Sequence, residues 1–205
     1  MIAIIDYGSG NVGAIMNILR QRKIPHVLTS DPATLADADR FILPGVGAFD
    51  PTMDILQRSG IVDALGEEVL GKGKKVLGIC VGMHLLADGS DEGSLPGLGW
   101  IPGRVRKIDT GRINAKPKLP HMGWNNVAIA PGAKLFDGVD EELGFYFLHS
   151  YYFDAADPAH IRAHVSYGAD LPCAVERDNV FGMQFHPEKS HSNGARVFVN
   201  FADAA

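Results

Sequence analysis

The first half of the chain alternates short apolar runs with amphipathic segments, and this alternation limits the folds that the chain can adopt. Four apolar runs are typical of buried strands: 2–6, 26–29, 41–43 and 76–80. Apolar residues recur at helical spacing over 12–22 and over 55–70, the second stretch with a break near Gly60. Such β-α-β alternation predicts an α/β fold with a mostly parallel sheet and helices on both faces.

The second half of the chain has a different pattern, in which strands follow one another directly. Consecutive strands are expected at 104–108, 124–129, 145–153, 161–167, 173–177 and 180–185, and a helix at 192–201. Tandem strands with short turns favour antiparallel pairing. We therefore expect antiparallel strands added to the α/β core, and all 205 residues (1–205) in a single domain.

Composition excludes several classes of protein. A net charge of −5 argues against nucleic acid or an anionic membrane as the main partner. No apolar run is long enough to span a membrane, and the N-terminus lacks the basic region of a signal peptide. Two cysteines, Cys80 and Cys173, cannot build a disulfide framework and fit a reducing compartment. The expected location is the cytoplasm.

Cys80 ends one of the apolar runs and has a glycine two residues away on either side, Gly78 and Gly82. A strand that ends at a nucleophile, turns sharply and enters a helix is the geometry of a nucleophile elbow. An apolar helical segment at 83–87 follows, and a helix N-terminus favours the thiolate over the thiol. A buried cysteine that acts as a small hydrophobic residue would give the same local sequence.

His186 and Glu188 follow the last apolar strand directly, separated by Pro187. A cysteine nucleophile needs a base, and the base needs a group that orients it. Glu188 can bind the second ring nitrogen of His186 and select its tautomer. By itself this turn would be an ordinary surface loop, and its combination with an elbow cysteine is what indicates catalysis.

A third element of such a site is a place for negative charge. The segment Pro44-Gly45-Val46-Gly47 follows a strand, so its backbone N–H groups are candidates to stabilise a tetrahedral intermediate. A glycine-rich turn before a helix is an equally good interpretation of these residues alone.

Together these motifs resemble those of the class I, triad-type glutamine amidotransferases. The resemblance narrows to the glutaminase subunits of imidazole glycerol phosphate synthases. Five blocks carry it, in the family's order along the chain: Asp6-Tyr-Gly-Ser-Gly-Asn11, Leu43-Pro-Gly-Val-Gly47, Pro120-His-Met-Gly-Trp124, Phe147-Leu-His-Ser-Tyr151 and Gln184-Phe-His-Pro-Glu-Lys-Ser190.

The resemblance implies a flavodoxin-like domain that hydrolyses glutamine to glutamate and ammonia without a metal or an organic cofactor. It also implies a heterodimer in which ammonia passes to a (β/α)8-barrel cyclase subunit that makes imidazole glycerol phosphate for histidine biosynthesis. A paralogue that supplies ammonia to another acceptor, such as a sugar, fits the same residues.

The family's functional residues map onto this chain in three groups. The catalytic group is Cys80 as nucleophile, His186 as base and Glu188 as orienting carboxylate, with an oxyanion strand at Gly45, Val46 and Gly47. The implied substrate-binding residues are Gly47, His84, His149, Ser150 and Tyr151. The implied partner-facing residues are Asn11, Met122, Trp124 and Tyr146.

Two positions carry further expectations. Val46 would supply an oxyanion donor only after a local peptide rearrangement, which a β-branched residue resists, so activity should be low until the partner's ligand shifts the segment. His84 replaces the family's usual glutamine, one helical turn after Cys80, and should face the same side. We expect His84→Gln to preserve or improve glutamine turnover.

Other interpretations of single motifs remain. Gly8-Ser-Gly10-Asn-Val-Gly13 matches a dinucleotide-binding fingerprint, with Asp31 near the ribose position, although Asp6 would repel a pyrophosphate. A catalytically silent binding protein is disfavoured because all three triad residues are present. His160 and His164 lack an acidic or thiol partner nearby in sequence, so a metal site is not expected. His121 is assigned to a partner-facing loop and Cys173 to the core.

Overall fold

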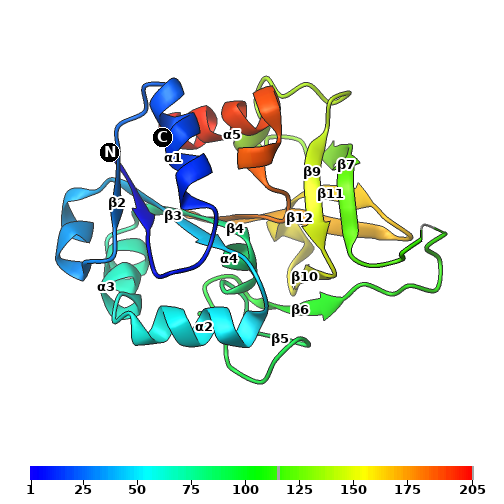
Figure 1. Cartoon of the computed structure of the whole chain (residues 1–205), viewed down its shortest axis with the longest axis horizontal. Helices are drawn as coiled ribbons and strands as arrows, with labels where there is room; N and C mark the ends of the chain where they lie inside the picture. Colours follow the sequence, from blue (N-terminus) through cyan, green and yellow to red (C-terminus); the bar gives the residue numbers. More distant parts are fainter. Residues whose placement is uncertain (115, 205) are drawn as a thin grey trace.

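An eight-stranded sheet forms the centre of the protein (Figure 1). The computed structural model describes residues 1–114 and 116–204. The strand order of this sheet is β2-β1-β3-β4-β13-β12-β11-β8. Its strands are β1 (Ile2–Ile5), β2 (His26–Thr29), β3 (Arg40–Gly45), β4 (Lys75–Cys80), β8 (Val127–Ile129), β11 (Ile161–Ser166), β12 (Asp170–Arg177) and β13 (Val180–Met183).

The pairing within this sheet confirms the predicted fold class. The five strands from β2 to β13 pair in parallel, in the 2-1-3-4-5 order of flavodoxin-like sheets, and β12, β11 and β8 continue the sheet in antiparallel pairs. All four residues of β1 are buried, as expected for a strand whose two faces are both covered.

Helices cover the two faces of the sheet, which Figure 1 shows nearly edge-on. One face carries α1 (Val12–Gln21) and α5 (His191–Asp203), and the other carries α2 (Phe49–Arg58), α3 (Val62–Gly66) and α4 (Val81–His84). Shorter helical turns, 3-10 except for the π-helical turn η2, connect the elements: η1 (Pro32–Asp37), η2 (Glu67–Gly71), η3 (Lys134–Phe136), η4 (Pro158–His160) and η5 (Pro187–Lys189).

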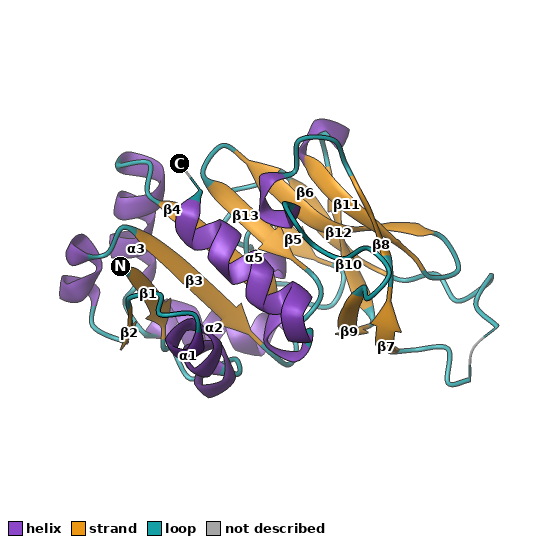
Figure 2. Ribbon diagram, turned by 90° about the horizontal axis from the view of Figure 1, so that it is seen from above, coloured by secondary structure: helices purple, strands orange, loops and turns teal. Residues whose placement is uncertain are grey.

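Two of the expected strands, 124–129 and 145–153, are each divided between two sheets. β7 (His121–Asn125) pairs with β9 (Phe145–His149), whereas β8 joins the central sheet and β10 (Tyr151–Ala155) pairs with β6 (Gly103–Lys107). β6 also pairs with β5 (Gly89–Ser90), which was not predicted. Exposed side chains recur at every second position across the β7–β8 junction, and residues 150–152 at the β9–β10 junction are all half-buried, so the periodicity of side chains did not reveal the change of sheet. Figure 2 shows β7 and β9 at the end of the molecule away from α1.

The predicted helix over 55–70 also differs in detail. The break near Gly60 is present, but α2 begins at Phe49, and the second part is α3 followed by the π-helical turn η2. The described residues, 1–114 and 116–204, contain no helix long and apolar enough to cross a membrane.

Candidate active site

Cys80 is the last residue of β4 and has the backbone conformation of a nucleophile elbow. Its φ of 54° and ψ of −113° are strained for a residue with a side chain. The flanking glycines are required by close backbone packing: a Cβ on Gly82 would lie 1.9 Å from the carbonyl oxygen of Leu43, and one on Gly78 would lie 2.7 Å from that of Gly82. The elbow inferred from the sequence is therefore present and tightly enclosed.

The helix after the elbow is shorter than the sequence predicted. α4 is a single turn that ends at His84, and the predicted helical segment at 83–87 begins two residues earlier, at Val81. A dipole summed over four residues is small, so α4 gives little of the thiolate stabilisation that we attributed to a helix N-terminus. Side chains around the sulfur have to provide most of it.

His186 is the first such side chain. Its Nδ1–H donates to Glu188 Oε1 over 2.9 Å, and both side chains are at least 95% buried. Burial alone would lower the pKa of the His186 imidazole, but its hydrogen bonds to Cys80 and Glu188 and the negative charges of both groups raise that pKa to about 10. The arrangement keeps the His186 imidazole protonated at neutral pH, between the carboxylate of Glu188 and the sulfur of Cys80.

The proposed oxyanion segment lies beside the cysteine, but its Val46 N–H is bonded elsewhere. Gly45 pairs with Cys80 in the β3–β4 ladder, and Val46 follows directly. The Val46 N–H donates to Ser9 Oγ over 3.0 Å, and the Ser9 hydroxyl lies 3.1 Å from the Val46 carbonyl oxygen. Val46 N–H is therefore already occupied, which agrees with the expectation that this peptide must rearrange.

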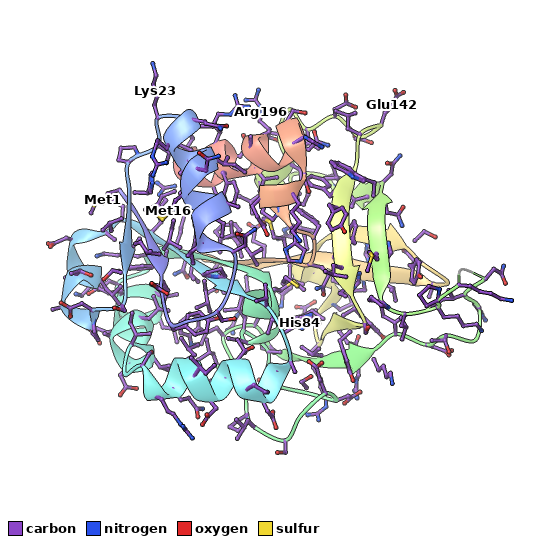
Figure 3. The ribbon with its side chains drawn as sticks, viewed as in Figure 1. Met1, Met16, Lys23, His84, Glu142 and Arg196 are labelled. Carbon is purple, nitrogen blue, oxygen red and sulfur yellow. The ribbon has the colours of Figure 1, made fainter. Side chains whose placement is uncertain are left out.

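A cavity of about 280 Å³ opens in front of Cys80. Of the residues predicted to be catalytic, oxyanion-forming or substrate-binding, it brings together Val46, Gly47, Cys80, His84, His149, Ser150, Tyr151 and His186. Glu188 lies behind His186 rather than in the cavity wall, and Gly45 is covered by β3–β4 pairing. His84 is 3% exposed and lies in the interior of the molecule (Figure 3).

His149 is fixed in one tautomer by two hydrogen bonds. Its Nδ1–H donates to the Tyr151 carbonyl over 2.8 Å, so its Nε2 accepts from His121 Nδ1 over 2.9 Å. Burial lowers the pKa of His149 to about 3 and that of His121 to about 4, so both imidazoles are neutral. His121 is also stacked between Phe147 and Tyr167 and is 3% exposed, so within the segment assigned to a partner-facing loop this side chain points inward.

Three residues of the site were not identified from the sequence. Glu92 and Lys189 line the cavity, and Gln184 is completely buried with its Nε2 3.8 Å from Cys80 Sγ. Gln184 and Lys189 belong to the block around His186, whereas Glu92 follows the unpredicted strand β5. The position of Gln184 within that block could have identified it as a site residue. No motif in the sequence pointed to Glu92.

The residues assigned to a partner surface lie outside the cavity. Met122 and Trp124, on one face of β7, are 61% and 46% exposed. The Trp124 ring meets Tyr146 edge-on at 6.4 Å, and Lys189 Nζ lies 5.4 Å from the Tyr146 ring centre. Asn11 is exposed at the start of α1. The exposed aromatic group is a suitable surface for a protein partner.

The competing motifs find other roles. In the loop after β1, the Tyr7 hydroxyl donates to the Pro44 carbonyl, and a Cβ on Gly10 would lie 2.5 Å from Pro44 Cβ, so this glycine-rich loop packs against β3. Such packing leaves no cradle for a pyrophosphate.

Cys173 is completely buried in β12, and burial raises the pKa of its thiol. In the part of the chain that the structure describes, no three His, Cys, Asp or Glu residues are grouped to hold a metal, and this includes the neighbourhood of His160 and His164.

Comparison with protein families agrees with this geometry over the whole chain. Residues 3–204 match the model of the family described as glutamine amidotransferase class-I. The imidazole glycerol phosphate synthase subunit HisH of Bdellovibrio bacteriovorus is 47% identical over 204 residues, which cover 99% of this chain and 100% of that protein. The subunit named HisH 2 in Pseudomonas aeruginosa is 43% identical over 205 residues, covering 99% of both chains.

Solved structures give the same fold at lower identity. A crystal structure titled glutamine amidotransferase superposes with a TM-score of 0.73 at 18% identity, covering 98% of this chain and 96% of that one. The crystal structure of a glutamine amidotransferase from Thermotoga maritima superposes with a TM-score of 0.62 at 22% identity, covering 99% of this chain and 80% of that one.

Proposed function

This chain belongs to the class I glutamine amidotransferase family, and on that premise we propose that it is the glutaminase subunit of an imidazole glycerol phosphate synthase. It hydrolyses the side-chain amide of glutamine and delivers the ammonia to a cyclase partner in histidine biosynthesis. The observation that carries the proposal is the buried Cys80–His186–Glu188 arrangement at the head of a cavity large enough for an amino acid.

We assign the chemical steps to the triad as follows. The Cys80 thiolate attacks the carboxamide carbon, and the His186 imidazolium gives its proton to the departing ammonia, which leaves a glutamyl thioester. The neutral imidazole then takes a proton from water, which attacks the thioester and releases glutamate and the free thiolate. Glu188 stabilises the imidazolium and holds its ring in place.

The walls of the cavity suggest how glutamine is held. Glu92 supplies a carboxylate for the α-ammonium group, and its side chain is fixed because Glu92 Oε2 accepts the Phe49 N–H over 2.9 Å. The segment from His149 to Tyr151 lies along the same cavity and is proposed to contact the backbone atoms of glutamine. His149 is neutral and is hydrogen-bonded at both ring nitrogens, so it forms a rigid part of the cavity wall and contributes no charge to the binding of glutamine.

The partner is proposed to be a (β/α)8-barrel protein that docks on the surface formed by Met122, Trp124 and Tyr146, with Asn11 as a further contact. Docking there also reaches Lys189, which lines the cavity and lies against Tyr146. The binding surface and the glutamine cavity are thus adjacent, which suits direct transfer of ammonia.

An isotope experiment tests this proposal. The chain and its barrel partner receive glutamine labelled with ¹⁵N in the amide, the phosphoribulosyl-carboxamide substrate, and excess unlabelled ammonium. We expect ¹⁵N in the imidazole product despite the unlabelled pool, because channelled ammonia does not mix with solvent. Unlabelled product would contradict channelling. Glutamate release without any imidazole product would favour the alternative, a paralogue that feeds another acceptor.

A second prediction concerns the rearrangement of the Val46 peptide. Ser9→Ala removes the hydroxyl that accepts the Val46 N–H, so the N–H becomes free to turn toward the cavity. We expect partner-free glutamate release to rise about 5- to 10-fold, the scale of one net hydrogen bond. Ser9→Thr retains the hydroxyl and serves as the control. A Ser9→Ala rate equal to that of the wild type would show that this contact does not restrain the oxyanion segment.

A further inference from the structure

In addition to the His186–Glu188 pair, a second group of buried, hydrogen-bonded polar side chains lies next to Cys80. Gln184, just after β13, is completely buried, and His84, the last residue of α4, is 3% exposed. His84 Nε2 lies 2.7 Å from Gln184 Oε1, and Gln184 Nε2 lies 3.8 Å from Cys80 Sγ. Gln184 is 100 positions from His84 and 104 from Cys80 in the chain, so these contacts depend on the fold.

The direction of each hydrogen bond follows from the chemistry of the groups. A carboxamide oxygen can only accept, so His84 must carry its proton on Nε2 and donate to Gln184 Oε1. The carboxamide –NH2 group then faces the sulfur and is the donor. Burial lowers the pKa of His84 to about 4, so the imidazole stays neutral and has this single tautomer at physiological pH.

A purely structural role would leave this arrangement hard to explain. Two apolar side chains of similar size would fill the same space without the cost of burying an amide and an imidazole. A donor directed at a thiolate, in contrast, forms a charge-assisted hydrogen bond, which is stronger than a neutral one. The main chain of Gln184 is itself anchored, since its N–H donates to the Cys173 carbonyl over 2.8 Å.

We propose that Gln184 is a further catalytic residue, whose carboxamide N–H stabilises the Cys80 thiolate, and that His84 is the positioning residue that keeps this carboxamide from turning over. If the carboxamide turned, its oxygen would face the negative sulfur and its –NH2 group would face the N–H of His84. The inference rests on the proposed glutaminase function. It also gives a role to the imidazole at position 84 that does not require contact with glutamine.

The test compares four variants in the complex with the barrel partner. Gln184→Leu removes the donor, and His84→Leu removes the group that orients it. His84→Gln keeps an N–H that can donate to Gln184 Oε1 and is the matched control, and Gln184→Glu retains the shape but presents a carboxylate to the sulfur. We expect kcat for glutamate release to fall about 10-fold in both leucine variants, with KM changed less than about twofold, and His84→Gln to recover most of the activity that His84→Leu loses.

Alkylation of Cys80 by iodoacetamide supplies a readout that a structural role would not alter. Its rate is followed from pH 5 to pH 10. The titratable groups around the sulfur or along the cavity are Tyr7, His84, Glu92, His149, Tyr151, His186, Glu188 and Lys189. We expect the profile to move to higher pH in Gln184→Leu, His84→Leu and, most strongly, Gln184→Glu, and to move much less in His84→Gln than in His84→Leu. An unchanged profile in folded Gln184→Leu would overturn the inference.

Two further outcomes are informative. If Gln184→Leu does not fold, the difference between His84→Leu and His84→Gln decides the question. If neither leucine variant folds, the side-chain ¹⁵N resonance of Gln184 is compared between the wild type and Cys80→Ala, and an unchanged shift overturns the inference. A wild-type complex that never releases glutamate would reject the proposed function, whereas the alkylation profiles would still report on Gln184.

Discussion

Cys80→Ala is expected to abolish glutamate release, with a loss of about 10⁴-fold or more in kcat. Cys80 is the nucleophile in the proposed mechanism, and a methyl group cannot form the thioester through which both half-reactions pass. The strained elbow is expected to persist, because its packing depends on Gly78 and Gly82 and an alanine at position 80 adds no atoms. The measurement is glutamate release by the complex with saturating glutamine.

Cys173→Ala is the matched control for this prediction. Both cysteines are buried, but Cys173 lies in β12 and contributes a core thiol rather than a cavity wall. We expect Cys173→Ala to retain kcat within about twofold and to lower the free energy of unfolding, since it removes a buried sulfur. Equal losses of activity in the two variants would show that Cys80 acts only through packing.

The elbow and the triad could be predicted because they are encoded by residues close together in sequence. Gly78, Cys80 and Gly82 lie within five positions, and His186 and Glu188 within three. The sequence pattern placed the strand at 180–185 among the antiparallel strands, whereas in the structure it is parallel to β4 and antiparallel only to β12, so its carboxyl end lies at the same edge of the sheet as Cys80. β4 and β13 pair in parallel, which places the two motifs side by side.

Contacts that depend on side-chain direction or on a change of sheet could not be predicted. The buried side of β7 carries His121 toward His149, whereas Met122 on its other side is exposed, and only the pairing of β7 with β9 determines which is which. The hydrogen bond between Ser9 and Val46 joins two loops 37 positions apart. Neither feature leaves a periodic pattern or a motif in the sequence.

His84 departs from the family motif, and the structure shows a contact of its imidazole that the sequence did not reveal. Its spacing from Cys80 correctly placed it at the cavity, and we interpreted it as a ligand for glutamine. The structure adds that its Nε2 is already engaged with Gln184, so only Nδ1 remains without a partner among the described residues. An imidazole and a carboxamide both carry an N–H group that can donate to Gln184 Oε1. His84→Gln is therefore expected to be tolerated.

His186→Asn is expected to lower kcat for glutamate release about 10³-fold, within the range of a lost general acid and base. Asparagine retains a polar side chain near Glu188 but cannot accept or donate the catalytic proton at neutral pH. His26→Asn, on the edge strand β2, is the control and should leave kcat unchanged. Activity retained in His186→Asn would mean that another group transfers the proton.

The pH dependence of Cys80 alkylation separates this role from a loss of packing. Because the pKa of His186 is raised to about 10, its imidazolium persists from pH 6 to pH 9 and provides a cation beside the Cys80 sulfur throughout that range. The wild type should therefore be alkylated faster than His186→Asn across this range. His186→Asn removes the imidazolium beside Cys80, and ordinary thiols ionise near pH 8.5. The rate of Cys80 alkylation at pH 6.5 should therefore be about 100-fold lower in the variant than in the wild type, and it should rise with pH. A flat profile in the variant would show that His186 does not stabilise the thiolate and would assign that role to Gln184, whose Nε2 lies 3.8 Å from the sulfur.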